Sequence, residues 1–274
     1  GSAWTFYGQS GLSKNGTVFT WANPNAPLGN QVLFLQNYGY VETEMVITNA
    51  GYYRFRFKAA WREGCCEKPK YIRVLVDGIE AGEVELRSKN YEEYVTLPLY
   101  MAAGTHTIKL EGDNPPMGGD YTGFVDDFNI QRIYEMPYNS YGVVPAGSTY
   151  VISSNTYNFT TLNVQGTLVA PQNHDVNINA NYIAVTGNGR FQIGQERSPY
   201  PRKATITLNG TDSTQHSMGT KFLGAMGSGV IELHGKEKVS WTKLRSTANV
   251  AALHIQLEDP VDWEVGDEII IAPT

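Results

Sequence analysis

The sequence predicts an all-β protein of two domains, a β-sandwich at residues 3–134 and a glycine-rich β-solenoid at residues 142–274. Three observations lead to this prediction. Apolar and polar residues alternate with period two in the first half, short apolar pairs separated by glycines recur in the second half, and runs of helix-forming residues are scarce. The 28 glycines and 17 tyrosines also favour turns and strands.

The sandwich prediction rests on alternation and on turn signals. In residues 53–59 an apolar side chain occupies every second position, and Arg or Lys fills the positions between. This pattern is typical of a half-buried antiparallel strand. Asp77 and Gly78 then supply a turn between strands. Further strands of the same set are expected at residues 72–76, 106–110 and 124–130.

The solenoid prediction rests on a repeat. Val164, Ile183, Ile206 and Ile231 follow one another at intervals of 19, 23 and 25 residues. One coil of a β-solenoid has about this period. A single coil cannot bury its apolar face alone, so each coil is expected to stack on the next one.

Two segments mark boundaries. Residues 134–141 contain Pro137 and are the expected linker between the domains. The apolar residues Ile269 to Ile271 predict a strand close to the end of the chain. Because such a strand would leave an open sheet edge, we expect the polypeptide to continue past Thr274.

Charge and composition exclude several classes of protein. The net charge is −6, the pI is about 5.4 and Lys and Arg form no basic stripe, so nucleic acid is not an expected partner. No apolar run reaches the roughly 20 residues of a membrane-spanning helix. Cys65 and Cys66 are adjacent, which leaves open either a strained ring disulfide or two free thiols.

The first half resembles the galactose-binding-like jelly-roll modules of secreted glycoside hydrolases and bacterial surface proteins. The order and spacing of several short segments carry this resemblance more than any one of them does. A jelly-roll sandwich with a carbohydrate-binding role is what the resemblance implies. The matching segments are residues 29–36, 51–60, 74–78, 103–108 and 122–128.

The second half resembles the G8 domain, a glycine-rich module of fibrocystin-type receptors and of hyaluronan-depolymerising proteins. The resemblance implies a right-handed β-solenoid that precedes a longer parallel β-helix. It also implies an extracellular, secreted or cell-surface location and a parent protein that acts on glycans. The matching segments are residues 144–147, 162–168, 191–194, 204–210, 233–236, 240–242 and 262–271.

Aromatic residues near the expected loops are candidates for binding sugar. Sugars present flat C–H faces on which aromatic rings stack, and neighbouring polar groups then fix the hydroxyls. The alternative for each ring is a place in the core or at a strand edge. Trp21 and Trp61 are the first choices, because loop sequence surrounds one and follows the other. The full set is Trp21, Trp61, Arg62, Tyr38 and Tyr121.

Asp126 is a candidate metal ligand. By alternation it points the same way as Phe124 and Phe128, and a carboxylate in such a position must be paired, hydrogen-bonded or bound to a metal. Jelly-roll modules of this kind often hold a structural calcium ion, which takes oxygen ligands. The alternative is that Asp126 accepts backbone N–H bonds or pairs with Arg56 or Arg62.

Three functions follow from these features. The leading hypothesis is a non-catalytic fragment that binds a polysaccharide or glycoconjugate and serves as a scaffold in a larger protein. The second is part of a polysaccharide-degrading, hyaluronidase-like enzyme, although no pair of carboxylates stands out and we name no catalytic residue. The third is an adhesion module whose domains contact other proteins.

Overall fold

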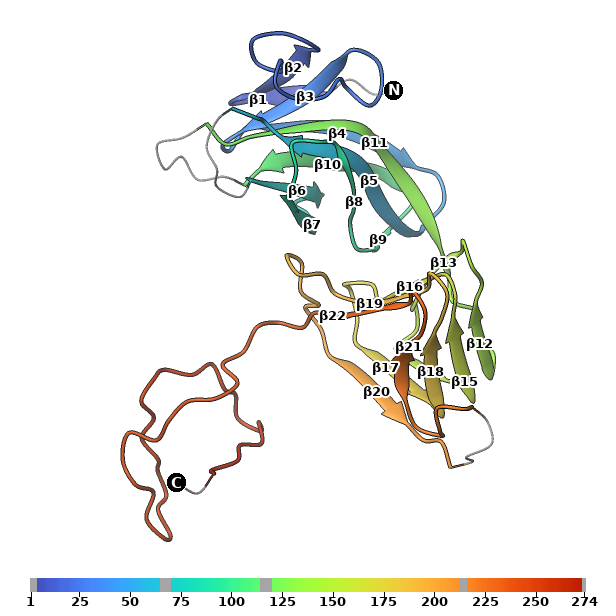
Figure 1. Cartoon of the computed structure of the whole chain (residues 1–274), viewed down its shortest axis with the longest axis vertical. Helices are drawn as coiled ribbons and strands as arrows, with labels where there is room; N and C mark the ends of the chain where they lie inside the picture. Colours follow the sequence, from blue (N-terminus) through green and yellow to red (C-terminus); the bar gives the residue numbers. More distant parts are fainter. Residues whose placement is uncertain (1–3, 65–69, 114–119, 212–215, 273–274) are drawn as a thin grey trace. The chain divides into compact units, whose positions relative to one another are not determined.

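The computed structural model describes residues 4–64, 70–113, 120–211 and 216–272 (Figure 1). Over these residues the chain forms strands β1 to β22 and no helix, so the all-β prediction is confirmed for them. Contacts divide the chain into two compact units, Gly1–His234 and Gly235–Thr274. All of these strands belong to the first unit. Cys65 and Cys66 lie outside the described residues.

Two antiparallel sheets form the first part of the first unit, and their facing sides share one apolar core. One sheet has the order β1-β4-β10-β6-β7, with β1 at Thr5–Tyr7, β4 at Tyr40–Ile47, β10 at Gly104–Gly112, β6 at Lys70–Val76 and β7 at Ile79–Leu86. In the other sheet β2 (Ser10–Lys14) pairs with β3 (Gln31–Gln36), β3 with β11 (Thr122–Glu135) and β11 with β5 (Gly51–Trp61). The short strands β8 (Glu92–Val95) and β9 (Leu99–Met101) both pair with β5.

The alternation expected in β5 is present. Phe55 and Phe57 are buried, whereas Arg54 and Arg56 between them are half-buried. Burying a large apolar side chain stabilises the fold by about 1.5–3 kcal/mol, so these aromatics dominate the sandwich core. The chain turns between β6 and β7 at Asp77–Gly78, where both residues have positive φ, 51° and 79°. That is the conformation of a two-residue hairpin turn, as the sequence predicted.

The second part of the first unit consists of parallel strands in three sheets, the second of which is continuous with β11 of the sandwich. Each of the first three coils of the chain contributes one strand to each sheet, and β21 and β22 add a fourth strand to two of them, so similar strands lie on one another (Figure 1). The first sheet holds β12 (Tyr141–Val144), β15 (Thr161–Val164), β18 (Tyr182–Val185) and β21 (Leu223–Ala225). The second holds β13 (Thr149–Val151), β16 (Thr167–Val169), β19 (Arg190–Ile193) and β22 (Val230–Leu233), and the third β14 (Thr156–Asn158), β17 (Val176–Ala180) and β20 (Ala204–Leu208).

The repeat deduced from the sequence does not align equivalent positions. Val164 and Ile183 lie in the first sheet, but Ile206 is in the third and Ile231 in the second. The register instead aligns Leu162 with Ile183 and Leu223, and Leu168 with Phe191 and Ile231. All three sheets use similar apolar pairs, so the pattern alone cannot tell them apart. The connection between β20 and β21 is also longer than the corresponding connections before it, so the spacing between equivalent residues is not constant.

Close backbone contacts explain the glycines of this part. Gly166, Gly189 and Gly229 occupy corresponding turns between the first and second sheets. Each lies against a carbonyl oxygen of the preceding passage of the chain. A Cβ at these positions would lie 2.2, 2.2 and 2.5 Å from the oxygens of Pro145, Val164 and Val185. Only glycine permits such a close approach.

The sandwich and the parallel strands are joined by a continuous strand. β11 pairs with β5 in the sandwich, and its last residues, Tyr134 and Glu135, pair in parallel with β13. Tyr52, Ile133 and Val151 bury one another at this junction. The expected linker at residues 134–141 therefore begins inside a strand, because β11 extends to Glu135.

The second unit has no regular structure in its described residues, 235–272. Within it, Leu244 and Leu257 form an isolated antiparallel bridge. The strand expected at Ile269 to Ile271 is absent, and Ile270 is 90% exposed. That prediction is wrong for this structure, because an apolar run forms a strand only where a neighbouring strand can pair with it.

Candidate carbohydrate-binding surface

Four of the five predicted sugar-binding residues lie at one edge of the sandwich, and Trp21 is on a loop tied to that edge. Trp61 ends β5 and Arg62 follows it, while Tyr121 precedes β11 and Tyr38 follows β3. The register pairs Trp61 with Gly123 and Gln36 with Thr122, so these strand ends lie side by side. Trp21 belongs to the connection between β2 and β3. We call Trp21, Tyr38, Trp61, Arg62 and Tyr121 the loop edge.

Arg62 holds the loop edge together. It forms an ion pair with Asp120, and its Nε donates to the carbonyl oxygen of Phe19 at 3.2 Å. The guanidinium also lies 4.0 Å from the centre of the Phe19 ring. Thr122 donates to the same aspartate. The alternative in which Arg62 pairs with Asp126 is wrong, because the partner of Arg62 is Asp120.

The loop that carries Trp21 is fixed on both sides of the indole. Thr20 is buried and donates to the carbonyl oxygen of Lys14 at 2.6 Å. The side-chain amide of Asn23 donates to the carbonyl of Trp61 at 2.7 Å, and its oxygen accepts the N–H of Glu63 at 2.9 Å. Trp21, between these anchors, is 73% exposed. No local pattern in the sequence shows that Asn23 reaches β5.

The remaining rings differ in their exposure. Tyr38 is 52% exposed, whereas Tyr121 is only 6% exposed and offers no free face. Trp61 was expected to be exposed, but it is half-buried and packs against the sandwich core. The reason is that β5 continues to residue 61, so Trp61 falls on the same inward face as Phe55 and Phe57. Trp21 and Tyr38 are the aromatics available at the loop edge.

Asp126 lies at a β-bulge. The pairing of β11 with β5 shifts between Asp126 and Asn129, and Asp127 has a φ of 50°. The carboxylate of Asp126 accepts the N–H of Leu28 at 2.6 Å and that of Asp127 at 2.8 Å. Such bonds satisfy a half-buried carboxylate, as the non-metal alternative expected. Among the described residues no group of three or more His, Cys, Asp or Glu could hold a metal ion, and calcium at Asp126 stays a prediction.

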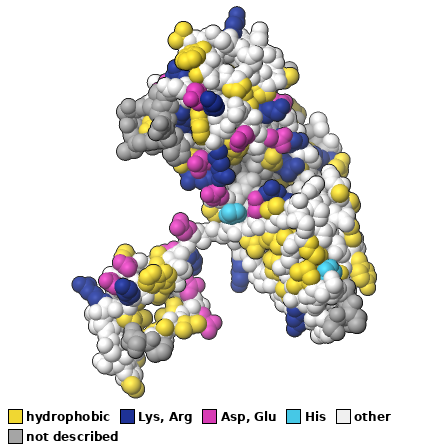
Figure 2. All heavy atoms as spheres, in the orientation of Figure 1, with side chains coloured by type: hydrophobic (Ala, Val, Ile, Leu, Met, Phe, Trp, Pro, Cys, Tyr) yellow, Lys and Arg dark blue, Asp and Glu magenta, His cyan; other side chains and the backbone are white. Residues whose placement is uncertain are grey.

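Charges are mixed over the surface. Figure 2 shows Lys and Arg interspersed with Asp and Glu on the visible face of the first unit. Arg56, the other arginine proposed as a partner of Asp126, pairs with Glu93 at 2.6 Å. Phosphate backbones attract continuous basic surfaces, so the mixed pattern visible on this face offers no basic stripe for nucleic acid. None of the described residues forms a helix long and apolar enough to cross a bilayer.

The fold and the loop edge define an all-β protein that couples an antiparallel sandwich to stacked parallel strands. Residues 135–245 match the family model of the G8 domain, which confirms the resemblance predicted for the second half. This part is similar to human fibrocystin-L, with 35% identity over 135 residues that cover 48% of this chain and 3% of that protein. It is also similar to zebrafish cell surface hyaluronidase, with 33% identity over 121 residues, 40% of this chain and 9% of that protein. The chain thus spans a small fraction of these relatives.

Solved structures similar to this chain include carbohydrate-binding modules. TmCBM61 in complex with β-1,4-galactotriose is 22% identical, with a TM-score of 0.33 over 47% of this chain and 88% of that one. The module CBM36 in complex with calcium and xylotriose is 17% identical, with a TM-score of 0.32 over 46% of this chain and 92% of that one. With scores this low, we base the fold on the strand pairing and not on these likenesses.

Proposed function

We propose that this chain binds carbohydrate at the loop edge, with Trp21 as the stacking platform. The observation that carries the proposal is the exposed indole of Trp21 between two anchored neighbours. Keeping a large apolar ring in water is unfavourable, and here the loop is also ordered around it. A ring held in this way stacks on a flat sugar face without a further loss of loop entropy.

The polar groups of the loop edge complete the site. The Arg62–Asp120 pair and Asn23 stand near the platform and fix its loop. The N–H groups of Arg62 that are not used by Asp120 and Phe19 orient hydroxyl groups of the sugar. One stacked ring contributes on the order of 1 kcal/mol beyond area burial. A single module therefore binds with modest affinity, and several copies or modules on one polysaccharide raise the affinity of the whole.

The parallel strands serve as the scaffold of the proposal. We take them as the first coils of a right-handed β-solenoid that continues into a longer β-helix. In the described residues β20, β21 and β22 each have a parallel partner on one side only, which leaves sheet edges that a further coil would pair. The similarity to a cell surface hyaluronidase supports an extracellular or cell-surface location. We assign no catalytic residue to the chain.

A glycan-array screen tests the proposal. The panel contains β-1,4-galactotriose and xylotriose, the sugars of the solved complexes above, together with longer neutral and acidic polysaccharides, with and without calcium. Wild-type protein is expected to bind a subset of the panel, and Trp21→Ala to bind that subset more weakly. Trp241→Ala is the matched control, because this indole is 70% exposed but lies in the second unit. Binding of Trp21→Ala at the wild-type level would contradict the proposal.

A further inference from the structure

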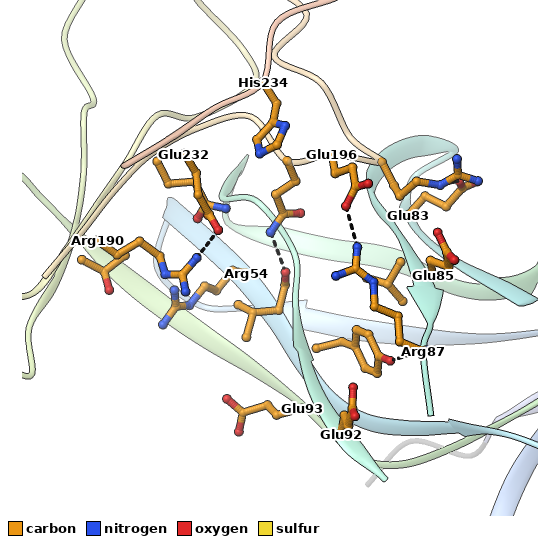
Figure 3. A pocket seen from close by; sticks show the side chains of 17 residues that line it. Arg54, Glu83, Glu85, Arg87, Glu92, Glu93, Arg190, Glu196, Glu232 and His234 are labelled. Carbon is orange, nitrogen blue, oxygen red and sulfur yellow. Dashed lines mark hydrogen bonds and ion pairs between the residues drawn. The ribbon is translucent and has the colours of Figure 1, made fainter. Parts of the chain in front are cut away.

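A cleft outside the loop edge lies between the sandwich and the parallel strands of the first unit (Figure 3). Its volume is about 700 Å³, within the range of small-molecule sites. Residues of β5, β7 and β8 line one side, and residues of β16, β19 and β22 line the other. The connection between β19 and β20 lines it as well, through residues 195–197.

This connection fastens the two sides of the cleft to each other. The side-chain amide of Gln195 donates to the carbonyl oxygen of Val95 at 3.0 Å. Ser198 is 4% exposed, and its hydroxyl accepts the backbone N–H of Glu83 at 2.8 Å. Arg197 also pairs with Glu83 at 3.4 Å. Because these contacts fix both sides, the cleft is preorganised, and a ligand does not have to order it.

Two arginine–glutamate pairs stand in the cleft, as the dashed lines of Figure 3 mark. Arg87 pairs with Glu196 at 2.5 Å, and Arg190 pairs with Glu232. Both pairs remain partly accessible to solvent. A guanidinium has five N–H donors and a carboxylate has several lone pairs, so each pair keeps donors and acceptors for a ligand.

Arg54 adds a donor of a different kind. Its Nε donates to the side-chain oxygen of Gln131 at 2.9 Å, and a terminal nitrogen donates to the hydroxyl of Thr149 at 3.4 Å. Both partners are neutral, and no ion pair of Arg54 occurs among the described residues. Burial, together with the nearby charge of Arg56, lowers the pKa of Arg54 to about 10, so it stays protonated at neutral pH. Its remaining N–H groups favour an oxygen acceptor.

The balance of charge selects the class of ligand. Four arginines and six glutamates line the cleft, so an extended polyanion would meet an excess of carboxylates. A hydroxyl group both donates and accepts, and it therefore matches Arg and Glu side chains equally well. We propose that this cleft is a second binding site that takes a neutral, hydroxyl-rich oligosaccharide, with Arg54 and Arg190 as donors and Glu232 as an acceptor. This site does not depend on the loop edge.

NMR titration with neutral oligosaccharides of galactose, xylose and glucose tests the cleft. We expect shifts at the backbone amides of Thr167, Arg190 and Gln192 both in wild-type protein and in Trp21→Ala. Arg190→Ala, made in the Trp21→Ala background, is expected to weaken this binding about ten-fold, because charge-assisted hydrogen bonds are lost. Arg190→Lys is expected to recover part of it. The matched control is Arg202→Ala, an exposed arginine that does not line the cleft.

Different results of this titration bear on the cleft and on the loop edge. Binding that disappears completely with Trp21→Ala, without any shift in the cleft, would overturn the second site and leave the loop edge supported. Cleft shifts that persist in Arg190→Ala at the wild-type affinity would also overturn it. Cleft shifts caused only by acidic oligosaccharides would overturn the ligand class proposed here. Cleft shifts in wild-type protein that are unchanged in Trp21→Ala would support the cleft and show that it binds independently of the loop edge.

Discussion

The sandwich and the parallel strands are both built from alternating sequence, yet they obtain their stability in different ways. The sandwich uses long strands, such as β5 at Gly51–Trp61, and fills its core with aromatic side chains. The parallel part uses strands of three to five residues, and its turns bring backbone against backbone at glycines. Both parts bury an apolar core, and the second depends in addition on the absence of side chains at its turns.

The largest effect is expected for Phe55→Ala in the sandwich core. Phe55 is fully buried and stacks on Phe128 with ring centres 5.5 Å apart. Loss of the ring leaves a cavity, and the free energy of unfolding should fall by about 3–5 kcal/mol. Denaturant unfolding measures this loss. Val46→Ala is the control, since Val46 is 68% exposed and should change stability by less than about 0.5 kcal/mol.

Gly189→Ala disrupts a close backbone contact at a glycine turn of the parallel strands. A Cβ at this position would lie 2.2 Å from the carbonyl oxygen of Val164, so the turn must move away from the preceding passage. We expect the free energy of unfolding to fall by about 3 kcal/mol, measured in the same way. Gly235→Ala is the matched control, because no atom lies within 4 Å of its would-be Cβ. Equal effects of the two substitutions would contradict the role assigned to the glycine turns.

A smaller effect is expected where the two parts meet. Ser198→Ala removes the acceptor of the Glu83 N–H and leaves that donor without its partner. A buried donor without a partner costs about 1–3 kcal/mol. The free energy of unfolding should therefore fall less than in Phe55→Ala or Gly189→Ala. The exposed Ser228→Ala serves as the control. A separate early unfolding transition of one part in Ser198→Ala would show that this bond is needed to couple them.

The smallest effect concerns the pH dependence of the junction. Burial and a hydrogen bond with Asp113 raise the pKa of Glu83 from its ordinary value of 4.5 to about 7. Because the folded pKa is the higher one, stability is greatest below pH 4.5 and decreases as the pH rises through about 7. With solvent screening, the decrease should be on the order of 1 kcal/mol. Glu83→Gln should remove it, and an unchanged pH profile of unfolding would contradict this.

Local patterns predicted the local features well. The alternation in β5 and the Asp77–Gly78 turn involve residues that are neighbours in the sequence, so the sequence carries a direct signal for them. The G8 resemblance, which rests on short local motifs, was confirmed over residues 135–245. The inward face of Trp61 was missed, because the strand continues past the clearest part of the pattern.

Features that join distant segments could not be predicted from these patterns. Asn23 bonds to β5, and Ser198 bonds to Glu83, more than 100 residues away in the sequence. The side chains that form such contacts are ordinary polar residues, and nothing next to them in the sequence indicates a partner. The same reason hides the cleft, whose two sides come from different parts of the chain.

Calorimetric titration of wild-type protein and Trp21→Ala with the best ligand of the array tests the central claim most directly. The account predicts at least about ten-fold weaker binding in Trp21→Ala, with an unchanged melting temperature because the indole is exposed. Trp241→Ala should bind as tightly as the wild type. Equal affinity of the wild type and Trp21→Ala would contradict carbohydrate binding at the loop edge.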